Sequence, residues 1–262
     1  VVIPALAEYP GLLNTLSDLA ANAPDLLART LCIVVVNNRA LPYARAEDVA
    51  NNAQLLNVLR SRIAQTGPLR LAYVDASSPG RELPEKGGVG WARKIGLDHA
   101  LAVLQANGKP HGALISLDAD TRVRADYIEV LAAFFTPPGR WAAVVNYAHP
   151  LDDAALAPAI LWYELFLRYL ELGLTYAGSP YAYPAIGSAI ACTAQAYAAV
   201  SGMNRRQAGE DFYFLQQLAK TGPVERVTGT VVLPAARRSH RVPFGTGASI
   251  NQYFDAPAGN YR

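Results

Sequence analysis

The stretch HGALISLDADTRVR, residues 111–124, decides the expected fold of this 262-residue chain. Ala113–Leu117 is a short, mostly apolar run that leads directly into Asp118 and Asp120. Such a run is typical of a strand buried on both faces of a parallel sheet, where ligands gather at the carboxyl ends of the strands. The two acids lie on one side of an extended backbone, which suits a divalent cation held by one or both of them. An alternative stays open at this point, because Asp120 before Thr121 is also a common helix cap.

Strands and helices alternate on either side of this stretch. The predicted strands are Val1–Ala5, Leu31–Val36, Leu69–Val74, Ala113–Leu117, Trp141–Tyr147, Ile186–Thr193 and Val227–Leu233. The predicted helices are Tyr9–Ala21, Ala46–Ile63, Trp91–Gln105, Asp152–Leu172 and one from Glu210 to about Gly222. This alternation predicts an α/β fold with a mainly parallel, twisted central sheet flanked by helices. We expect one domain over residues 1–236, and a basic tail, 237–262, that forms a loop over the site or a disordered end.

Composition limits the classes of partner. The chain is 52% hydrophobic and 17% charged with a formal net charge of +2, which is too mild a charge to indicate nucleic acid. Cys32 and Cys192 each lie in an apolar run, as small core residues of a protein in a reducing compartment do. No apolar run approaches the roughly 20 residues that cross a bilayer. We therefore expect a cytoplasmic protein, at most in peripheral contact with the inner face of the membrane.

Two further groups of residues are candidates for chemistry. Glu210 and Asp211 open a predicted helix, where the helix dipole alone favours acids, but an acid there can also act as a general base. Arg237, Arg238, His240 and Arg241 can bind phosphate oxygens and complete a metal shell, or form a solvated basic tail.

The glycine-rich turn Lys86–Lys94 enters a predicted helix and adds a weak signal for anion binding. It is not a Walker A loop, because no Gly-Lys-Ser/Thr follows. The remaining histidines, His99, His111 and His149, have no partners close in sequence and are expected to be surface or structural residues.

Taken together and in this order, these segments resemble family 2 glycosyltransferases of the GT-A fold. The resemblance spans roughly Val1 to Gly222. It rests on VVIPALAEYPGLLNTLSDL (1–19), IVVVNN (33–38), GGVGWARKIGLDHAL (87–101), ISLDADTRV (115–123) and GSAIACTAQAYAAVSGMNRRQAGEDFYFLQQLAKTG (187–222). The D-A-D and the later E-D, about ninety residues apart and each in its expected setting, are its most specific parts.

The resemblance implies transfer of a hexose from a nucleotide-diphospho-sugar to an acceptor hydroxyl, with inversion and with Mn²⁺ or Mg²⁺. Asp118 and Asp120 match the pair that holds the metal and the diphosphate, with Asp120 the more direct ligand. Asp211 matches the general base, with Glu210 beside it. His240 resembles a late histidine that reaches the metal or the diphosphate.

The resemblance also implies a donor-binding surface. Its residues would be Pro4, Ala5, Glu8, Asn37, Asn38, Arg93 and Arg241, together with Asp118 and Asp120. Members of the family usually carry an aspartate where Asn37 and Asn38 stand, so uracil recognition does not follow. The Q-x-x-R-W motif of processive synthases is missing from the sequence, which predicts a single transfer rather than polymerisation.

Tyrosine faces stack on sugar rings, so we expect the acceptor near Tyr176–Tyr183, a stretch that suits core packing or an oligomer contact equally well. Two other functions remain open. A sugar-phosphate nucleotidyltransferase of similar fold would release pyrophosphate, and a non-catalytic protein that binds sugar nucleotides would bind the donor without turnover.

Overall fold

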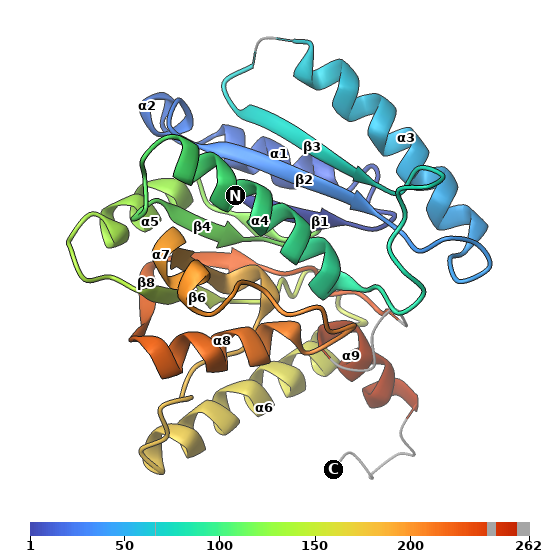
Figure 1. The fold of residues 1–262 in the computed structure, drawn as a ribbon. Coiled ribbons are helices and arrows are strands. Elements are labelled where there is room, and N and C mark those ends of the chain that lie inside the picture. The colour runs from blue at the N-terminus through green and yellow to red at the C-terminus, as the bar shows by residue number, and fades with distance from the viewer. Residues whose placement is uncertain (66, 240–244, 256–262) are drawn as a thin grey trace.

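The structure is a computed structural model that describes residues 1–65, 67–239 and 245–255 (Figure 1). The strands of the described part form one eight-stranded sheet in the order β3-β2-β1-β4-β7-β6-β8-β5. The strands are β1 (Val2–Ala5), β2 (Leu31–Asn37), β3 (Arg70–Ala76), β4 (Ala113–Ser116), β5 (Arg122–Val123), β6 (Ala142–Tyr147), β7 (Ile190–Thr193) and β8 (Val224–Leu233). The helices are α1 (Leu12–Ala20), α2 (Pro24–Leu27), α3 (Ala46–Ile63), α4 (Val89–Ala106), α5 (Tyr127–Phe135), α6 (Ala157–Tyr176), α7 (Ala194–Ala199), α8 (Glu210–Thr221) and α9 (Thr246–Asp255), with a 3₁₀ turn η1 (Gly187–Ala189).

The first half of the sheet is parallel. Val2 of β1 lies opposite Ile33 of β2 on one side and Ser116 of β4 on the other, and β3 extends the sheet beyond β2. Helix α4 packs on β1 and β2, as Figure 1 shows. A Cβ at Gly96 would lie 2.3 Å from Val2 Cγ1, so glycine allows this close approach of helix and sheet. The carboxyl ends of β1, β2 and β4 therefore meet at one edge.

The second half of the sheet is mixed. Strand β7 runs antiparallel to both β4 and β6, while β6 and β8 are parallel and the short β5 is antiparallel to β8. The expected α/β fold with a central sheet flanked by helices is confirmed. The sheet is parallel from β3 to β4 and mixed from β7 onward.

Most buried side chains form one core cluster around the sheet, which includes both cysteines. Burial raises the thiol pKa of Cys32 to about 11 and that of Cys192 to about 12. The prediction that both are core residues is confirmed. A second, small cluster contains Ala159 and Ile160 of α6 and Ile250 of α9.

The tail differs from its prediction. Residues Thr246–Asp255 form helix α9, so the expectation of a loop or a disordered end is wrong there. The helix forms because Ile250 is buried against α6, a contact that no local pattern reveals. His240 and Arg241 lie outside the described residues.

Smaller differences concern element boundaries. The predicted strand Ile186–Thr193 begins with the turn η1 and becomes extended only at Ile190, and α6 starts later than predicted and continues to Tyr176. Helices α2, α5 and α7 were not predicted. Over the described ranges, none of the helices is both long enough and apolar enough to cross a membrane.

Candidate functional site

The turn after β4 carries the first two acids. Thr121 N donates to Asp118 O at 3.2 Å, and the chain continues into β5, so no helix starts at Asp120 and the capping interpretation is wrong. Thr15 Oγ1 donates to Ala119 O at 2.9 Å and ties the turn to α1. The turn therefore presents Asp118 and Asp120 at the carboxyl end of β4, as the sequence predicted.

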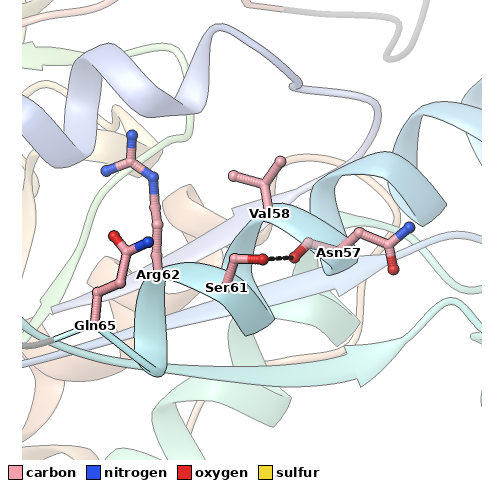
Figure 2. Close-up of a pocket in the computed structure, with 5 residues that line it drawn as sticks. All are labelled: Asn57, Val58, Ser61, Arg62 and Gln65. Atoms are coloured by element: carbon pink, nitrogen blue, oxygen red, sulfur yellow. Dashed lines mark hydrogen bonds between the residues drawn. The ribbon is translucent and has the colours of Figure 1, made fainter.

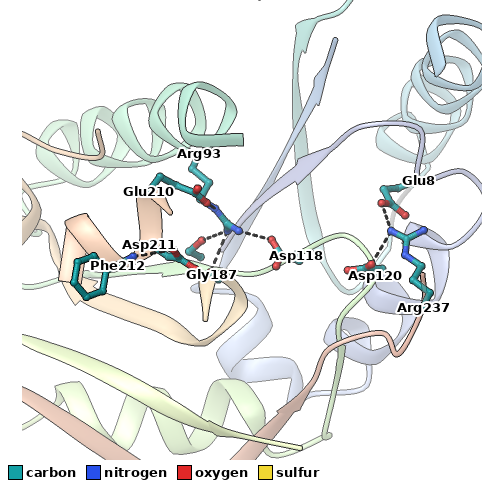
Figure 3. A network of polar contacts seen from close by, with 10 residues as sticks. Glu8, Arg93, Asp118, Asp120, Gly187, Glu210, Asp211, Phe212 and Arg237 are labelled. Atoms are coloured by element: carbon teal, nitrogen blue, oxygen red, sulfur yellow. Dashed lines mark hydrogen bonds and ion pairs between the residues drawn. The ribbon is translucent and has the colours of Figure 1, made fainter. Parts of the chain in front are cut away.

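Arg93 of α4 joins Asp118 to the second acidic group (Figure 3). Its Nη2 donates to Asp118 Oδ1 at 2.7 Å, and its Nε donates to Glu210 Oε1 at 2.9 Å. A third nitrogen, Nη1, donates to Ser116 Oγ at 2.6 Å and to Gly187 O at 3.0 Å. Two acids about ninety residues apart in sequence thus share one guanidinium group.

The Arg93 group is buried. Only 4% of Arg93 is exposed, and Glu210 is buried as well. Burial alone lowers the pKa of Arg93, but Asp118 and Glu210 outweigh it and raise the pKa above its ordinary value, so the guanidinium stays charged. A Cβ at Gly187 would lie 2.1 Å from Arg93 Nη2, so a larger residue there would have to displace the guanidinium.

Asp211 lies next to this group at the start of α8. Burial raises the pKa of Asp211, the neighbouring Glu210 raises it further, and Arg93 acts in the opposite direction. Asp211 Oδ1 accepts a hydrogen bond from Phe212 N at 2.8 Å. A carboxylate whose pKa is raised toward neutral pH has the property that a general base requires.

A second arginine joins the other two acids of the edge. Arg237 Nη2 lies 2.6 Å from Asp120 Oδ2 and also forms an ion pair with Glu8. Figure 3 shows this group beside the Arg93 group. Burial raises the pKa of Asp120 to about 6, although Arg237 opposes the change, and Asp118 and Glu8 add to it. Two carboxylates therefore share the Arg237 guanidinium, and the five acids of the edge outnumber its two arginines, which leaves surplus negative charge.

A divalent cation fits this surplus charge. Within the described ranges no group of three or more His, Cys, Asp and Glu side chains is arranged to hold a metal ion by itself. Mg²⁺ and Mn²⁺ are usually held by one or two carboxylates together with substrate oxygens, so Asp118 and Asp120 suffice as protein ligands. Both side chains are partly exposed and accessible to such an ion.

Asn37 and Asn38 are turned inward at the end of β2. Asn37 Nδ2 donates to Ala5 O at 3.1 Å, and Asn38 Nδ2 donates to Ser77 O at 3.3 Å. Asn52 of α3 donates to Asn38 Oδ1 at 2.8 Å. The role of Asn37 and Asn38 in binding the donor stays a prediction, and their amide groups already hold β1, β2 and α3 together.

The other predicted donor-binding residues fall into different surroundings. Pro4 and Ala5 are buried within β1, while Glu8 lies at the edge beside Arg237. His240 and Arg241 lie outside the described residues, so the structure tests neither. In the glycine-rich turn, a Cβ at Gly90 would lie 2.4 Å from Arg206 O, so that glycine serves close packing against the chain before α8.

Sequence reasoning missed three contacts of the site. Ser116 and Gly187 were not candidates, and Arg237 was grouped with the basic tail without its acidic partners. The position of Ser116 two residues before Asp118 was an available signal. No local signal joins Arg237 to Glu8, because 229 residues separate them.

His149 is a structural residue, as expected. Its Nδ1 lies 2.9 Å from Glu164 Oε1 and its Nε2 lies 2.9 Å from Thr246 Oγ1. Burial raises the pKa of Glu164, but hydrogen bonds from His149 and Arg168 outweigh it and hold the pKa at about 2. These contacts join the end of β6 to α6 and to the first residue of α9.

A surface hollow lies elsewhere, along α3. Its volume is about 470 Å³. Figure 2 shows the residues that line it, Asn57, Val58, Ser61, Arg62 and Gln65. It is open to solvent and contains no acid, histidine or cysteine. The clustered acids at the strand ends are the better candidate, because burial raises the pKa values of Asp120 and Asp211 there.

Comparisons with known proteins agree with the fold. No protein-family profile matches the chain, and a comparison with characterised proteins by sequence finds no match. Among solved structures, the chain is similar to residues 1–349 of S. aureus TarS in complex with UDP-GlcNAc, with a TM-score of 0.58 and 11% identity. The similarity covers 92% of this chain and 59% of that one.

Two further structures are similar. The mannosyltransferase PcManGT from Pyrobaculum calidifontis, in complex with GDP-Man and Mn²⁺, gives a TM-score of 0.51 at 14% identity over 90% of this chain and 56% of that one. GalNAc-T7 with UDP, GalNAc and Mn²⁺ gives a TM-score of 0.50 at 15% identity. The similarity covers 89% of this chain and 43% of that one. These identities establish the architecture alone. The chain has the GT-A fold of glycosyltransferases, as the resemblance in its sequence predicted.

Proposed function

We propose that the chain is a glycosyltransferase that moves a sugar from a nucleotide-diphospho-sugar to an acceptor hydroxyl. The observation that carries the proposal is the contact of Asp118 and Glu210 with the same Arg93, which brings the acids of β4 and α8 to one edge of a GT-A sheet. The similar TarS and PcManGT structures contain UDP-GlcNAc and GDP-Man, which supports a donor of this class.

Asp118 and Asp120 hold the leaving group in this proposal. They would hold Mn²⁺ or Mg²⁺, and such an ion would supply positive charge beside the departing diphosphate. His240, outside the described residues, would be a further metal ligand. Glu8, Arg241 and the segments of Pro4-Ala5 and Asn37-Asn38 would bind the donor. Arg93 contributes by holding Asp118 in place, since its nitrogens already donate to protein oxygens.

Asp211 takes the proton. The acceptor oxygen attacks the anomeric carbon of a hexose from the face opposite the diphosphate, which inverts that centre, and the diphosphate leaves with the bonding electrons. The hydroxyl proton passes to the carboxylate of Asp211, while Glu210 stays paired with Arg93. The acceptor lies near Tyr176–Tyr183, and the protein acts in the cytoplasm or at the inner face of the membrane.

A panel of nucleotide-sugars tests the proposal by thermal shift and by release of nucleoside diphosphate, each with Mn²⁺ and with EDTA. A ligand that binds the native state raises Tm by mass action. We expect one donor to raise Tm in the presence of Mn²⁺, and Asp120→Asn to abolish that increase. Asp211→Asn is expected to keep the increase in Tm and to lose transfer by a factor of about 10² to 10⁴.

The exposed Asp25→Asn serves as the matched control, because it makes the same chemical change on α2, outside the acidic site. If no nucleotide-sugar raises Tm, the proposed function fails. Release of pyrophosphate from a nucleoside triphosphate and a sugar phosphate would instead identify a nucleotidyltransferase, and donor binding without turnover would identify a binding protein.

A further inference from the structure

A second hollow lies between α8 and the loop that leads into this helix. Its volume is about 280 Å³. Residues 200–204 and Arg206 line it from the loop, and Tyr213, Phe214 and Gln217 line it from α8. Among these lining residues, all of which the structure describes, none is Asp or Glu and none belongs to the candidate site at the strand ends. The hollow is therefore a separate and uncharged surface apart from Arg206.

Arg206 is held in place by an aromatic ring and by its main chain. Its Cζ lies 3.6 Å from the centre of the Tyr213 ring. Arg206 N donates to Asn204 Oδ1 at 3.2 Å, and Arg206 O accepts from Gly90 N of α4 at 3.2 Å. A guanidinium that stacks on a ring keeps its N–H groups available for oxygen atoms. Because the group is already positioned, little side-chain freedom is lost when an anion binds to it.

The N–H groups of Arg206 have no acceptor among the described residues. Every other arginine side chain in those ranges, except Arg62 and Arg205, has a hydrogen bond or an ion pair. The side chains of Ser201 and Gln217 also form no hydrogen bond within the described part of the chain. Three polar side chains that line one hollow are thus unused by the fold.

The apolar part of the lining is closely packed. Met203 and Phe214 are each 2% exposed, and the Phe214 ring meets the edge of the Tyr197 ring at 5.8 Å. Asn204 Nδ2 donates to Glu210 O at 2.7 Å, which ties the loop to the start of α8. The hollow therefore has a fixed apolar base below its polar side chains.

This combination of side chains suits a phosphate group. Arginine binds phosphate oxygens through two parallel hydrogen bonds, and a serine hydroxyl and a glutamine amide are neutral donors for the remaining oxygens. The lining has no carboxylate that would repel the anion. Ligand pockets usually have volumes of about 300–1,000 Å³, so this smaller hollow suits a phosphate group with a short organic attachment.

We propose that this hollow binds the phosphate group of a small molecule through Arg206, with Ser201 and Gln217 as further donors. The proposal does not depend on the proposed glycosyl transfer, because it uses none of the residues assigned to the donor or to the metal. Without metal, the carboxylates of Asp118 and Asp120 repel phosphate, so binding at the strand ends is not confused with binding in the hollow.

Calorimetric titration of the metal-free protein tests the proposal, with inorganic phosphate and glycerol 3-phosphate as probes. We expect saturable binding of both. Tighter binding of glycerol 3-phosphate would identify a phosphate monoester as the ligand, and tighter binding of inorganic phosphate would identify the free ion. Acetate is the control anion and is expected to bind more weakly than either probe.

Substitutions in the lining show where the probes bind. Arg206→Ala is expected to weaken binding by a factor on the order of 10 to 100, because charge-assisted hydrogen bonds are lost. Arg206→Lys should lie between this variant and wild type, since it keeps the charge without the two parallel donors. Gln217→Glu adds a negative charge at an exposed position of α8 and should also weaken binding. An unchanged Tm shows that each variant folds.

Arg62→Ala is the matched control, because Arg62 is also an arginine without a side-chain partner in the described ranges and lines the hollow along α3. It should leave the affinity for both probes unchanged. The proposal is wrong if wild type shows no saturable binding, if Arg206→Ala binds as tightly as wild type, or if Arg62→Ala loses as much affinity as Arg206→Ala. Acetate that binds as tightly as phosphate would also overturn it, since the hollow would then not select phosphate.

Discussion

Arg93 and Arg237 each join two carboxylates from distant parts of the chain, but the surroundings of the two guanidinium groups differ. Arg93 is 4% exposed and also donates to Ser116 and Gly187. The side chain of Arg237 is 44% exposed and pairs with Glu8 and Asp120 at the rim. A buried ion pair is costly to break from one side, whereas an exposed pair exchanges easily with water or ions. Arg93 thus holds the site together, whereas the contacts of Arg237 are open to exchange with solvent.

Replacement of Arg93 should give the largest effect. Arg93→Ala leaves Glu210 buried without its counter-charge and releases Asp118. We expect the free energy of unfolding to fall by about 3–5 kcal/mol, measured by urea denaturation. Arg29→Ala, at an exposed pair with Asp25, should cost about 0–1 kcal/mol. A loss below about 1 kcal/mol for Arg93→Ala would remove the distinction between the two arginines.

Gly187→Ala tests the close packing around Arg93. The new Cβ would lie 2.1 Å from Arg93 Nη2 and must displace it. We expect a loss of about 1–3 kcal/mol in urea denaturation. Gly173→Ala in α6 is the matched control, because a Cβ there meets nothing within 4 Å, and it should stabilise the helix by about 0.5–1 kcal/mol. Equal effects of the two substitutions would contradict the packing argument.

Asp211→Asn should change how stability depends on pH. Burial, and then Glu210, raise the pKa of Asp211 above its ordinary value of 3.8. The folded protein therefore binds this proton more tightly than the unfolded chain, and the free energy of unfolding falls as pH rises from about 4 through the raised pKa.

We therefore expect Asp211→Asn to be more stable than wild type at about pH 8, and the difference to shrink toward about pH 4. Urea denaturation at several pH values measures it. Asp25→Asn controls for loss of a carboxylate in a first helical turn. A constant difference across this range would show that the pKa of Asp211 is not raised.

The smallest change in stability is expected for Arg237→Ala, about 0–1 kcal/mol. The effect of this substitution on Mn²⁺ binding should be larger. Glu8 and Asp120 lose the positive charge of Arg237, so Mn²⁺ should bind several-fold more tightly in calorimetric titration. Arg238→Ala, which pairs with Asp255, is the control. Unchanged or weaker Mn²⁺ binding in Arg237→Ala would mean that Arg237 and the metal occupy different positions.

The spacing of apolar residues along the sequence predicted the helices and strands that depend on neighbouring residues. The apolar run before Asp118 predicted β4 and the acidic turn, and the stripe from Ala46 to Ile63 predicted α3. The Thr193 cap of α7, whose side chain accepts from Ala196 N, was also visible in the sequence and was missed.

Other features depend on contacts between distant residues. The antiparallel position of β7 between β4 and β6 follows from strand pairing, which no single segment encodes. Helix α9 forms against α6, and Arg237 meets Asp120 only after the chain has folded. The end of β2 is held by Asn52 of α3, which donates to the main-chain oxygen of Asn37 and to the side-chain oxygen of Asn38. Sequence therefore identified the acids of the candidate site but not the arginine contacts that arrange them.

The two buried cysteines allow the opening of each half of the sheet to be followed separately. Cys32 lies in β2 of the parallel half and Cys192 lies in β7 of the mixed half. Because burial raises both thiol pKa values, an alkylating reagent reacts only when the surrounding strands separate. Mass spectrometry of the two labelled peptides would therefore give two opening rates from one unmodified protein. Equal rates would mean that the sheet opens as one cooperative unit, and unequal rates would identify the half that separates first.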